Sequence, residues 1–95
     1  MAAKITLSSI AQRKTDIVDA NIDGETVMMS IENGEYYGLD TVASDIWAML
    51  EMPIQVESIC QRLMTDYDVS KETCITDVLQ FLNQLQENEI IEVSI

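Results

Sequence analysis

The sequence contains no histidine, the side chain that serves most often as a general base and as a metal ligand. A Ser-His-Asp or Cys-His catalytic arrangement is therefore impossible. Neither a G-x-G-x-x-G nor a G-x-x-x-x-G-K-[ST] pattern occurs, so phosphate binding has no signature. Asp66 and Asp68 flank a predicted helix end but lack the glycine and glutamate of a calcium loop. These absences predict a binding protein without catalytic activity, metal or cofactor.

Cysteine is scarce, and no apolar run is long. Cys60 and Cys74 are the only cysteines, each lies in a helical pattern, and there is no C-x-x-C. A small secreted scaffold would carry more cysteines, so we predict two buried free thiols. No apolar stretch approaches the roughly 20 residues that span a bilayer, and the N-terminus lacks the regions of a signal peptide. We therefore expect a soluble, cytosolic protein.

Positive charge is also rare. The chain has 5 basic and 17 acidic residues, a formal net charge of −12. Lys4, Arg13 and Lys14 precede the first acid, and only Arg62 and Lys71 follow it. A protein with this much negative charge repels phosphate backbones and anionic lipids, which argues against nucleic acid or a membrane surface as the partner. It favours neutral or basic partners, although the acids would equally serve solubility alone.

The 95 residues suffice for one domain, residues 1–95, with a small core. Alternating apolar residues over 5–10 predict a short edge strand within a basic N-terminal arm, residues 1–15. A loop follows over residues 11–15. Two further strands are predicted over residues 16–22 and 25–31.

Asn33-Gly34 is the strongest hairpin signal, because both residues tolerate the positive φ of a type I′ turn. A two-residue turn there predicts the cross-strand pairs Ile31 with Tyr36, Ser30 with Tyr37 and Met28 with Leu39. Neither face of the resulting hairpin is polar. The sheet is therefore either covered on both sides or offers apolar surface to a partner.

Helical periodicity dominates after residue 40. Asp40 is a predicted N-cap, and the helix that follows has an apolar stripe of Val42, Ile46, Met49 and Leu50, widened by Trp47. Glu51-Met52-Pro53 interrupts the pattern, and a second helix is predicted over residues 55–66.

Ser70 is the predicted N-cap of a third helix over residues 71–87. Its core stripe is Ile75, Val78, Leu79, Leu82 and Leu85. Phe81 falls on a shoulder with Cys74 and Leu85, beside Asp77 and Gln84. Residues 90–93 predict a short final strand.

Several short runs share an order and spacing with a known family. These are Tyr36-Tyr37-Gly38-Leu39-Asp40, Ile46-Trp47, Tyr67-Asp68-Val69, Asp77-Val78-Leu79-Gln80-Phe81-Leu82 and Ile90-Ile91-Glu92-Val93. Together they resemble the PqqD-like family, the leader-recognition domains of ribosomal peptide natural-product biosynthesis. The resemblance covers about residues 17–93 and is strongest to the short stand-alone members of lasso-peptide pathways. The family usually has asparagine where this chain has Asp40, which keeps the capping role.

The resemblance implies an α+β, winged helix-turn-helix-like fold, with a three-stranded antiparallel sheet followed by three helices. It implies that a precursor's leader peptide binds as an added strand in a cleft between a sheet edge and the third helix. The domain would be non-catalytic and free of cofactor, and would present the leader to a maturation enzyme such as a leader peptidase.

The implied peptide-binding residues come from two elements. The hairpin would contribute Met28, Met29, Ser30, Tyr36 and Tyr37, and the third helix Asp77, Phe81 and Gln84. The methionines and aromatic residues among them could equally be core residues, and that interpretation stays open for each of these five. Two other functions also stay open. A winged-helix transcription factor would need a basic face, but the third helix carries only Lys71; a small structural subunit would form a homodimer through the open sheet edge.

Overall fold

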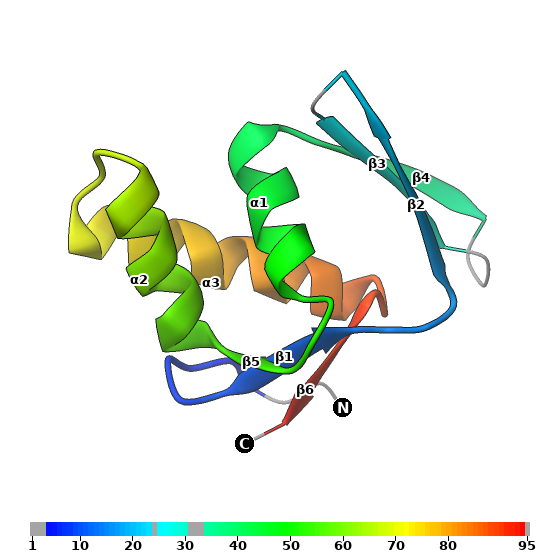
Figure 1. Ribbon diagram of the computed structural model, residues 1–95. Helices are drawn as coiled ribbons and strands as arrows, with labels where there is room; N and C mark the ends of the chain where they lie inside the picture. Colours follow the sequence, from blue (N-terminus) through cyan, green and yellow to red (C-terminus); the bar gives the residue numbers. More distant parts are fainter. Residues whose placement is uncertain (1–3, 24, 31–33, 95) are drawn as a thin grey trace.

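The computed structural model describes residues 4–23, 25–30 and 34–94 of the 95-residue chain. In these residues three helices accompany two small antiparallel sheets (Figure 1). In chain order the elements are β1 (Ile10–Arg13), β2 (Ile17–Ile22), β3 (Glu25–Ser30), β4 (Glu35–Leu39), α1 (Thr41–Met49), β5 (Ile54–Gln55), α2 (Val56–Asp66), α3 (Lys71–Glu87) and β6 (Ile91–Ser94). The α+β class with three helices is as predicted.

The first sheet has the strand order β2-β3-β4. The predicted pairing of β3 with β4 was wrong by two residues, because Met28 pairs with Tyr37 and Thr26 with Leu39. The register therefore differs from the one that a two-residue turn on Asn33-Gly34 would give. Of the predicted turn only Gly34 lies in the described part of the chain, and its φ of 68° is the positive value expected there. A shift by two residues leaves every side chain on its predicted face.

The second sheet, with the order β5-β1-β6, was not predicted. The strand predicted over residues 5–10 was wrong, because the chain turns at Ser9, whose side chain accepts a hydrogen bond from the Thr6 amide at 2.9 Å. The strand β1 instead occupies the stretch predicted as a loop, and it lies in the centre of its sheet rather than at an edge. The predicted final strand is confirmed as β6.

The helices agree closely with the prediction. Asp40 caps α1 by accepting a hydrogen bond from the Ala43 amide at 2.8 Å, and Ser70 caps α3 by accepting one from Thr73. The exception within α1 is Val42, which was placed on the buried stripe but is 40% exposed. The buried stripe of α3 is likewise rotated toward Cys74, which leaves Ile75 and Leu79 only partly buried.

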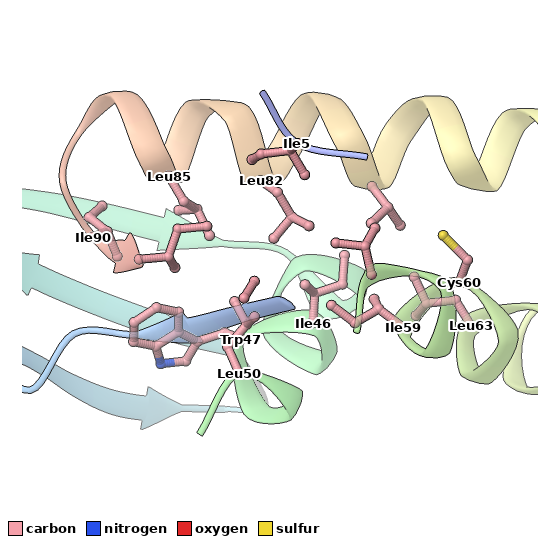
Figure 2. Packing of buried hydrophobic residues seen from close by; sticks show 14 of the residues in the cluster. Ile5, Ile46, Trp47, Leu50, Ile59, Cys60, Leu63, Leu82, Leu85 and Ile90 are labelled. Carbon is pink, nitrogen blue, oxygen red and sulfur yellow. The ribbon is translucent and has the colours of Figure 1, made fainter. Parts of the chain in front are cut away.

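The core lies between α3 and the elements that precede it (Figure 2). Trp47, Leu50, Ile59, Leu82 and Ile90 are among its largest fully buried side chains. They come from α1, α2, α3 and the segments beside them, so one cluster holds helices and both sheets together. Burial of such a side chain contributes about 1.5–3 kcal/mol.

Both cysteines are free and buried, as predicted. Cys74 on α3 donates a weak hydrogen bond from its Sγ to the carbonyl oxygen of Cys60 on α2, at 3.7 Å. Burial raises the pKa of the Cys60 thiol to about 11, and burial also raises the pKa of Cys74. Both thiols therefore stay protonated at neutral pH and behave as small apolar side chains.

Three polar contacts attach the first sheet to α1, and in one of them the Ser44 hydroxyl donates to the carbonyl oxygen of Leu39 of β4 at 3.3 Å. The hydroxyl of Ser44 accepts a hydrogen bond from the Thr26 amide of β3 at 2.9 Å. The indole Nε1 of Trp47 donates to Asp19 Oδ2 of β2 at 2.6 Å. The guanidinium of Arg13 bonds the same oxygen at 2.8 Å and lies 4.6 Å from the centroid of the Trp47 ring. Asp19 thus joins β1, β2 and α1.

Replacement of Asp19 tests this junction. Asp19→Ala leaves the buried indole N–H without its acceptor, and we expect it to lower the free energy of unfolding by about 1–3 kcal/mol. Asp19→Asn removes the charge but keeps a side-chain oxygen for the indole, so its loss should be smaller. Urea unfolding of the two variants and the parent measures both values. Equal stability of Asp19→Ala and the parent would contradict this account of the junction.

The second prediction concerns pH. The Cys60 thiol has an ordinary pKa of 9.0 and a folded-state pKa of about 11, so the folded state holds its proton more tightly. The resulting stabilisation is present below pH 9 and declines as pH rises toward 11. The stability advantage of the parent over Cys60→Ala should therefore shrink across this window. Urea unfolding of both proteins from pH 7 to 11 measures this difference in the free energy of unfolding. The contributions of other groups that titrate in this range cancel in the comparison. A difference that stays constant with pH would contradict the prediction.

Candidate functional site

Two adjoining hollows beside α3 form the candidate site. The first, called here the β4–α3 cleft, has a volume of about 430 Å³. It is lined from the sheet by Met28, Tyr36, Tyr37, Gly38 and Leu39, from the start of α1 by Asp40 and Ala43, and from α3 and its end by Phe81, Gln84, Leu85 and Asn88. The cleft thus has an edge strand as one wall and a helix as the other.

The backbone of β4 is part of the wall. Tyr36 and Tyr37 both line the cleft, although consecutive side chains of a strand point to opposite faces. Gly38 lines it too and has no side chain to contribute. In the described residues β4 pairs with β3 alone. Alternate N–H and C=O groups of an edge strand point away from its partner, so β4 offers them to the cleft.

The second hollow, called here the α1–α3 groove, has a volume of about 550 Å³. It is lined by Asp40, Val42, Ala43, Ile46, Leu63, Tyr67, Val69, Cys74, Asp77, Val78, Gln80, Phe81 and Gln84. Four of these residues, Asp40, Ala43, Phe81 and Gln84, also line the β4–α3 cleft. The two hollows are therefore continuous, and Phe81 lies where they meet.

The walls combine apolar and polar side chains, and their charged members are acidic. Asp40 and Asp77 line the hollows, and neither lining contains a lysine or arginine. The Tyr67 hydroxyl in the groove donates a hydrogen bond to the Asp45 carboxylate, and this bond raises the pKa of Tyr67. The site therefore suits an apolar ligand with neutral or basic polar groups.

The structure brings most of the predicted site residues together. Met28, Tyr36, Tyr37, Phe81 and Gln84 line the β4–α3 cleft, with Met28 fully buried as its floor. Asp77 lines the α1–α3 groove beside Phe81 and Gln84.

Two predicted residues lie elsewhere. Met29 pairs with Tyr36 on the face of the sheet opposite Met28 and lines neither hollow. The backbone of Ser30 pairs with Ile17 and Glu35 within the sheet.

The prediction missed several lining residues. Leu85 and Val42 were assigned to the core and Asp40 to capping, yet all three line a hollow. Asn88 directly follows α3, and no pattern in the sequence predicted that it lines the cleft. Only the structure shows that Val42 lines the groove, because its side chain is 40% exposed although its helical spacing predicted burial.

Among residues 4–23, 25–30 and 34–94, no group of three or more Cys, Asp or Glu side chains could hold a metal ion. None of the helices in that part of the chain is both long and apolar enough to cross a membrane. An edge strand that faces a helix across a cleft is a geometry that receives an extended peptide.

Comparisons with known proteins agree with this geometry. The family model described as coenzyme PQQ synthesis protein D (PqqD) matches residues 25–91. Among solved structures, the chain resembles TbiB1 in complex with the TbiA(beta) leader peptide, with 34% sequence identity and a TM-score of 0.80. That similarity covers 85% of this chain and 94% of the other.

A second solved structure shares the fold. It is a lasso peptide synthetase B1 complexed with the leader peptide, with 23% identity, a TM-score of 0.77, and coverage of 86% of this chain and 96% of that one. No curated protein sequence matches the chain.

Proposed function

The chain belongs to the PqqD family, and we propose that it binds the leader peptide of a ribosomally made precursor peptide as a strand added to β4. The observation that carries the proposal is the edge position of β4, which in the described part of the chain has β3 as its only neighbouring strand and lines the β4–α3 cleft opposite α3. Main-chain hydrogen bonds along this edge supply affinity, and the side-chain pockets supply specificity. Residues 1–95 act as one recognition domain.

Of the two edges of this sheet, β4 is the better receptor. The other edge, β2, lines neither hollow, and its Asp19 is engaged by Trp47 and Arg13. A strand on β4 would lie between the sheet and Phe81, which shields its backbone bonds from water. Hydrogen bonds shielded from water are stronger, so a peptide strand in the cleft should bind to β4 in preference to β2.

The added strand would alternate its side chains between two environments. One set enters the β4–α3 cleft against Met28, Tyr37, Phe81 and Gln84, and the α1–α3 groove with Asp77 receives the residues beyond the paired stretch. Tyr36 flanks the strand from the other face. Met29 and Ser30 lie on the neighbouring strand β3 and contribute by holding β4 in register.

The protein is proposed to be a non-catalytic presenter of the leader to a maturation enzyme such as a leader peptidase. The absence of histidine and the protonated thiols support a role in binding. A DNA-binding role is disfavoured, because Lys71 is the only basic residue of α3.

Selective N-methylation of the peptide tests strand addition. The probe is a labelled leader peptide from the precursor encoded beside this protein, titrated by fluorescence anisotropy. We expect saturable binding of roughly −8 to −12 kcal/mol. Methylation of alternate amides should abolish binding and methylation of the intervening amides should not, because an added strand donates every second N–H to its neighbour.

Two results would count against the proposal. Tight binding to duplex DNA with none to the leader would overturn leader recognition itself. Binding that responds equally to methylation of every amide would overturn the added strand.

Substitutions on α3 locate the site. Phe81→Ala removes the apolar wall shared by the two hollows and should weaken leader binding by about 1–3 kcal/mol, roughly 5- to 150-fold. Leu79→Ala is the matched control, since Leu79 is also partly buried on α3 but lines neither hollow. It should cost stability and leave affinity unchanged.

Charge reversal gives a second matched pair. Asp77→Lys alters the exposed margin of the α1–α3 groove, whereas Glu72→Lys alters an exposed position of α3 outside both hollows. Only the former should reduce leader affinity, and the unfolding midpoint should change little in both. If Phe81→Ala and Asp77→Lys fold and bind like the parent, the hollows beside α3 are not the site.

A further inference from the structure

The α1–α3 groove begins where the edge strand β4 ends. The last residue of β4 is Leu39 and the first of α1 is Thr41, so Asp40 joins the two elements. Asp40 also lines both the β4–α3 cleft and the α1–α3 groove. A peptide strand that pairs with β4 and continues past Leu39 would therefore pass directly from the cleft into the groove.

The groove has an apolar wall that several elements build. Val42 and Ile46 come from α1, Leu63 from α2, Val69 from the segment before α3, and Val78 from α3. Val42 is 40% exposed, so part of this wall is open to water. The volume of about 550 Å³ lies within the roughly 300–1,000 Å³ of ligand pockets. The groove therefore has the room and the apolar surface for a long aliphatic side chain.

The charges at the groove are negative. Asp40, at the start of α1, and Asp77, on α3, both line it. Tyr67 lines it too, and its hydroxyl lies in the field of further carboxylates: the hydrogen bond to Asp45 raises the pKa of Tyr67 most, and the charges of Asp66 and Asp40 raise it further. Carboxylates from all three helices thus act on this groove.

Neither lining carboxylate has a basic partner in the part of the chain that the structure describes, where the one ion pair joins Arg13 to Asp19. Asp40 accepts the Ala43 amide with Oδ1 alone, which leaves its Oδ2 for a ligand. Asp77 is exposed on α3. The groove therefore offers two carboxylates that no cation of the described chain neutralises.

This combination of an apolar wall and two carboxylates selects the kind of side chain that fits. An apolar side chain would strip water from the carboxylates without replacing it, which costs free energy. A neutral polar group could bond one carboxylate but would leave the charge of the other uncompensated. A lysine or arginine avoids both costs, because its aliphatic stem covers the apolar wall and its charged head bonds carboxylates.

We infer that the α1–α3 groove is a specificity subsite for a lysine or arginine of the leader peptide, and this inference rests on the proposed function. The basic residue lies just beyond the stretch that pairs with β4, on the side of Leu39. Its stem packs against Val42 and its head bonds Asp40, Asp77 or both. Main-chain pairing along β4 is indifferent to sequence, so this contact distinguishes one leader from another.

The inference is tested with substitutions that remove charge and nearly conserve shape. Asp40→Asn keeps the cap of α1, because asparagine caps a helix as well as aspartate does. Asp77→Asn changes an exposed residue, and Glu72→Gln is its matched control, since Glu72 is an exposed acid of α3 outside both hollows.

The probe is the labelled leader peptide from the precursor encoded beside this protein. Each lysine of the peptide is replaced in turn by norleucine and each arginine by citrulline, which keep the stem and remove the charge. Fluorescence anisotropy measures the affinity of every peptide for every protein variant, and thermal unfolding verifies that each variant is folded.

We expect one peptide substitution, next to the paired stretch that N-methylation locates, to weaken binding to the parent by roughly tenfold. The same substitution should have little effect on binding to the double variant Asp40→Asn/Asp77→Asn, because the carboxylates that the cation contacts are gone. Glu72→Gln should retain the full effect. Added salt should weaken binding to the parent more than binding to the double variant.

Three results would overturn the inference. They are a leader with no lysine or arginine next to its paired stretch, binding that no neutralised lysine or arginine weakens, and a loss of equal size in the parent, the double variant and Glu72→Gln. The last result would assign the effect to the net charge of the protein rather than to the groove. Failure of the proposed function is distinct, because the parent would then not bind the unmodified leader at all.

Discussion

Attachment of the β2-β3-β4 sheet to α1 is the constraint on which the site depends. The Ser44 hydroxyl holds the Thr26 amide of β3, and the Trp47 indole holds the Asp19 carboxylate of β2. Because Trp47 is also packed into the core with Leu82 and Leu85 of α3, these bonds fix where the sheet stands relative to α3. The width of the β4–α3 cleft follows from that placement. The Ser44 hydroxyl also bonds the carbonyl oxygen of Leu39, which lines the cleft.

The excess of acidic residues affects which partners the protein can bind. No lysine or arginine lines the hollows beside Asp40 and Asp77. The sequence from Thr15 to Gln61, which includes Asp23 and Glu35, contains none either. The charge contributes little to the fold, but it discourages self-association and favours neutral or basic partners.

Sequence reasoning anticipated the helical half of the site better than the strand half. Phe81, Asp77 and Gln84 were placed correctly on one shoulder of α3, since helical geometry fixes which residues share a face. Met28 and Met29 were proposed together, yet only Met28 lines the cleft. Both faces of the hairpin are apolar, so alternation could not tell which one α1 covers. The register of β3 against β4 also differs by two residues from the one that the turn signal indicated.

Local chemistry in the sequence determined the helices, because caps such as Asp40 and Ser70 and apolar periodicity act over a few residues. It also determined, through alternation, which residues of the β3–β4 hairpin share a face. Only the tertiary structure decided the β5-β1-β6 sheet, since two-residue β5 has no pattern of its own and β1 is stabilised by partners about 40 and 80 residues away. The tertiary structure alone also decided where the β4–α3 cleft and the α1–α3 groove lie. They exist because β4, α1 and α3 are held at set distances by a core whose contacts join distant parts of the chain.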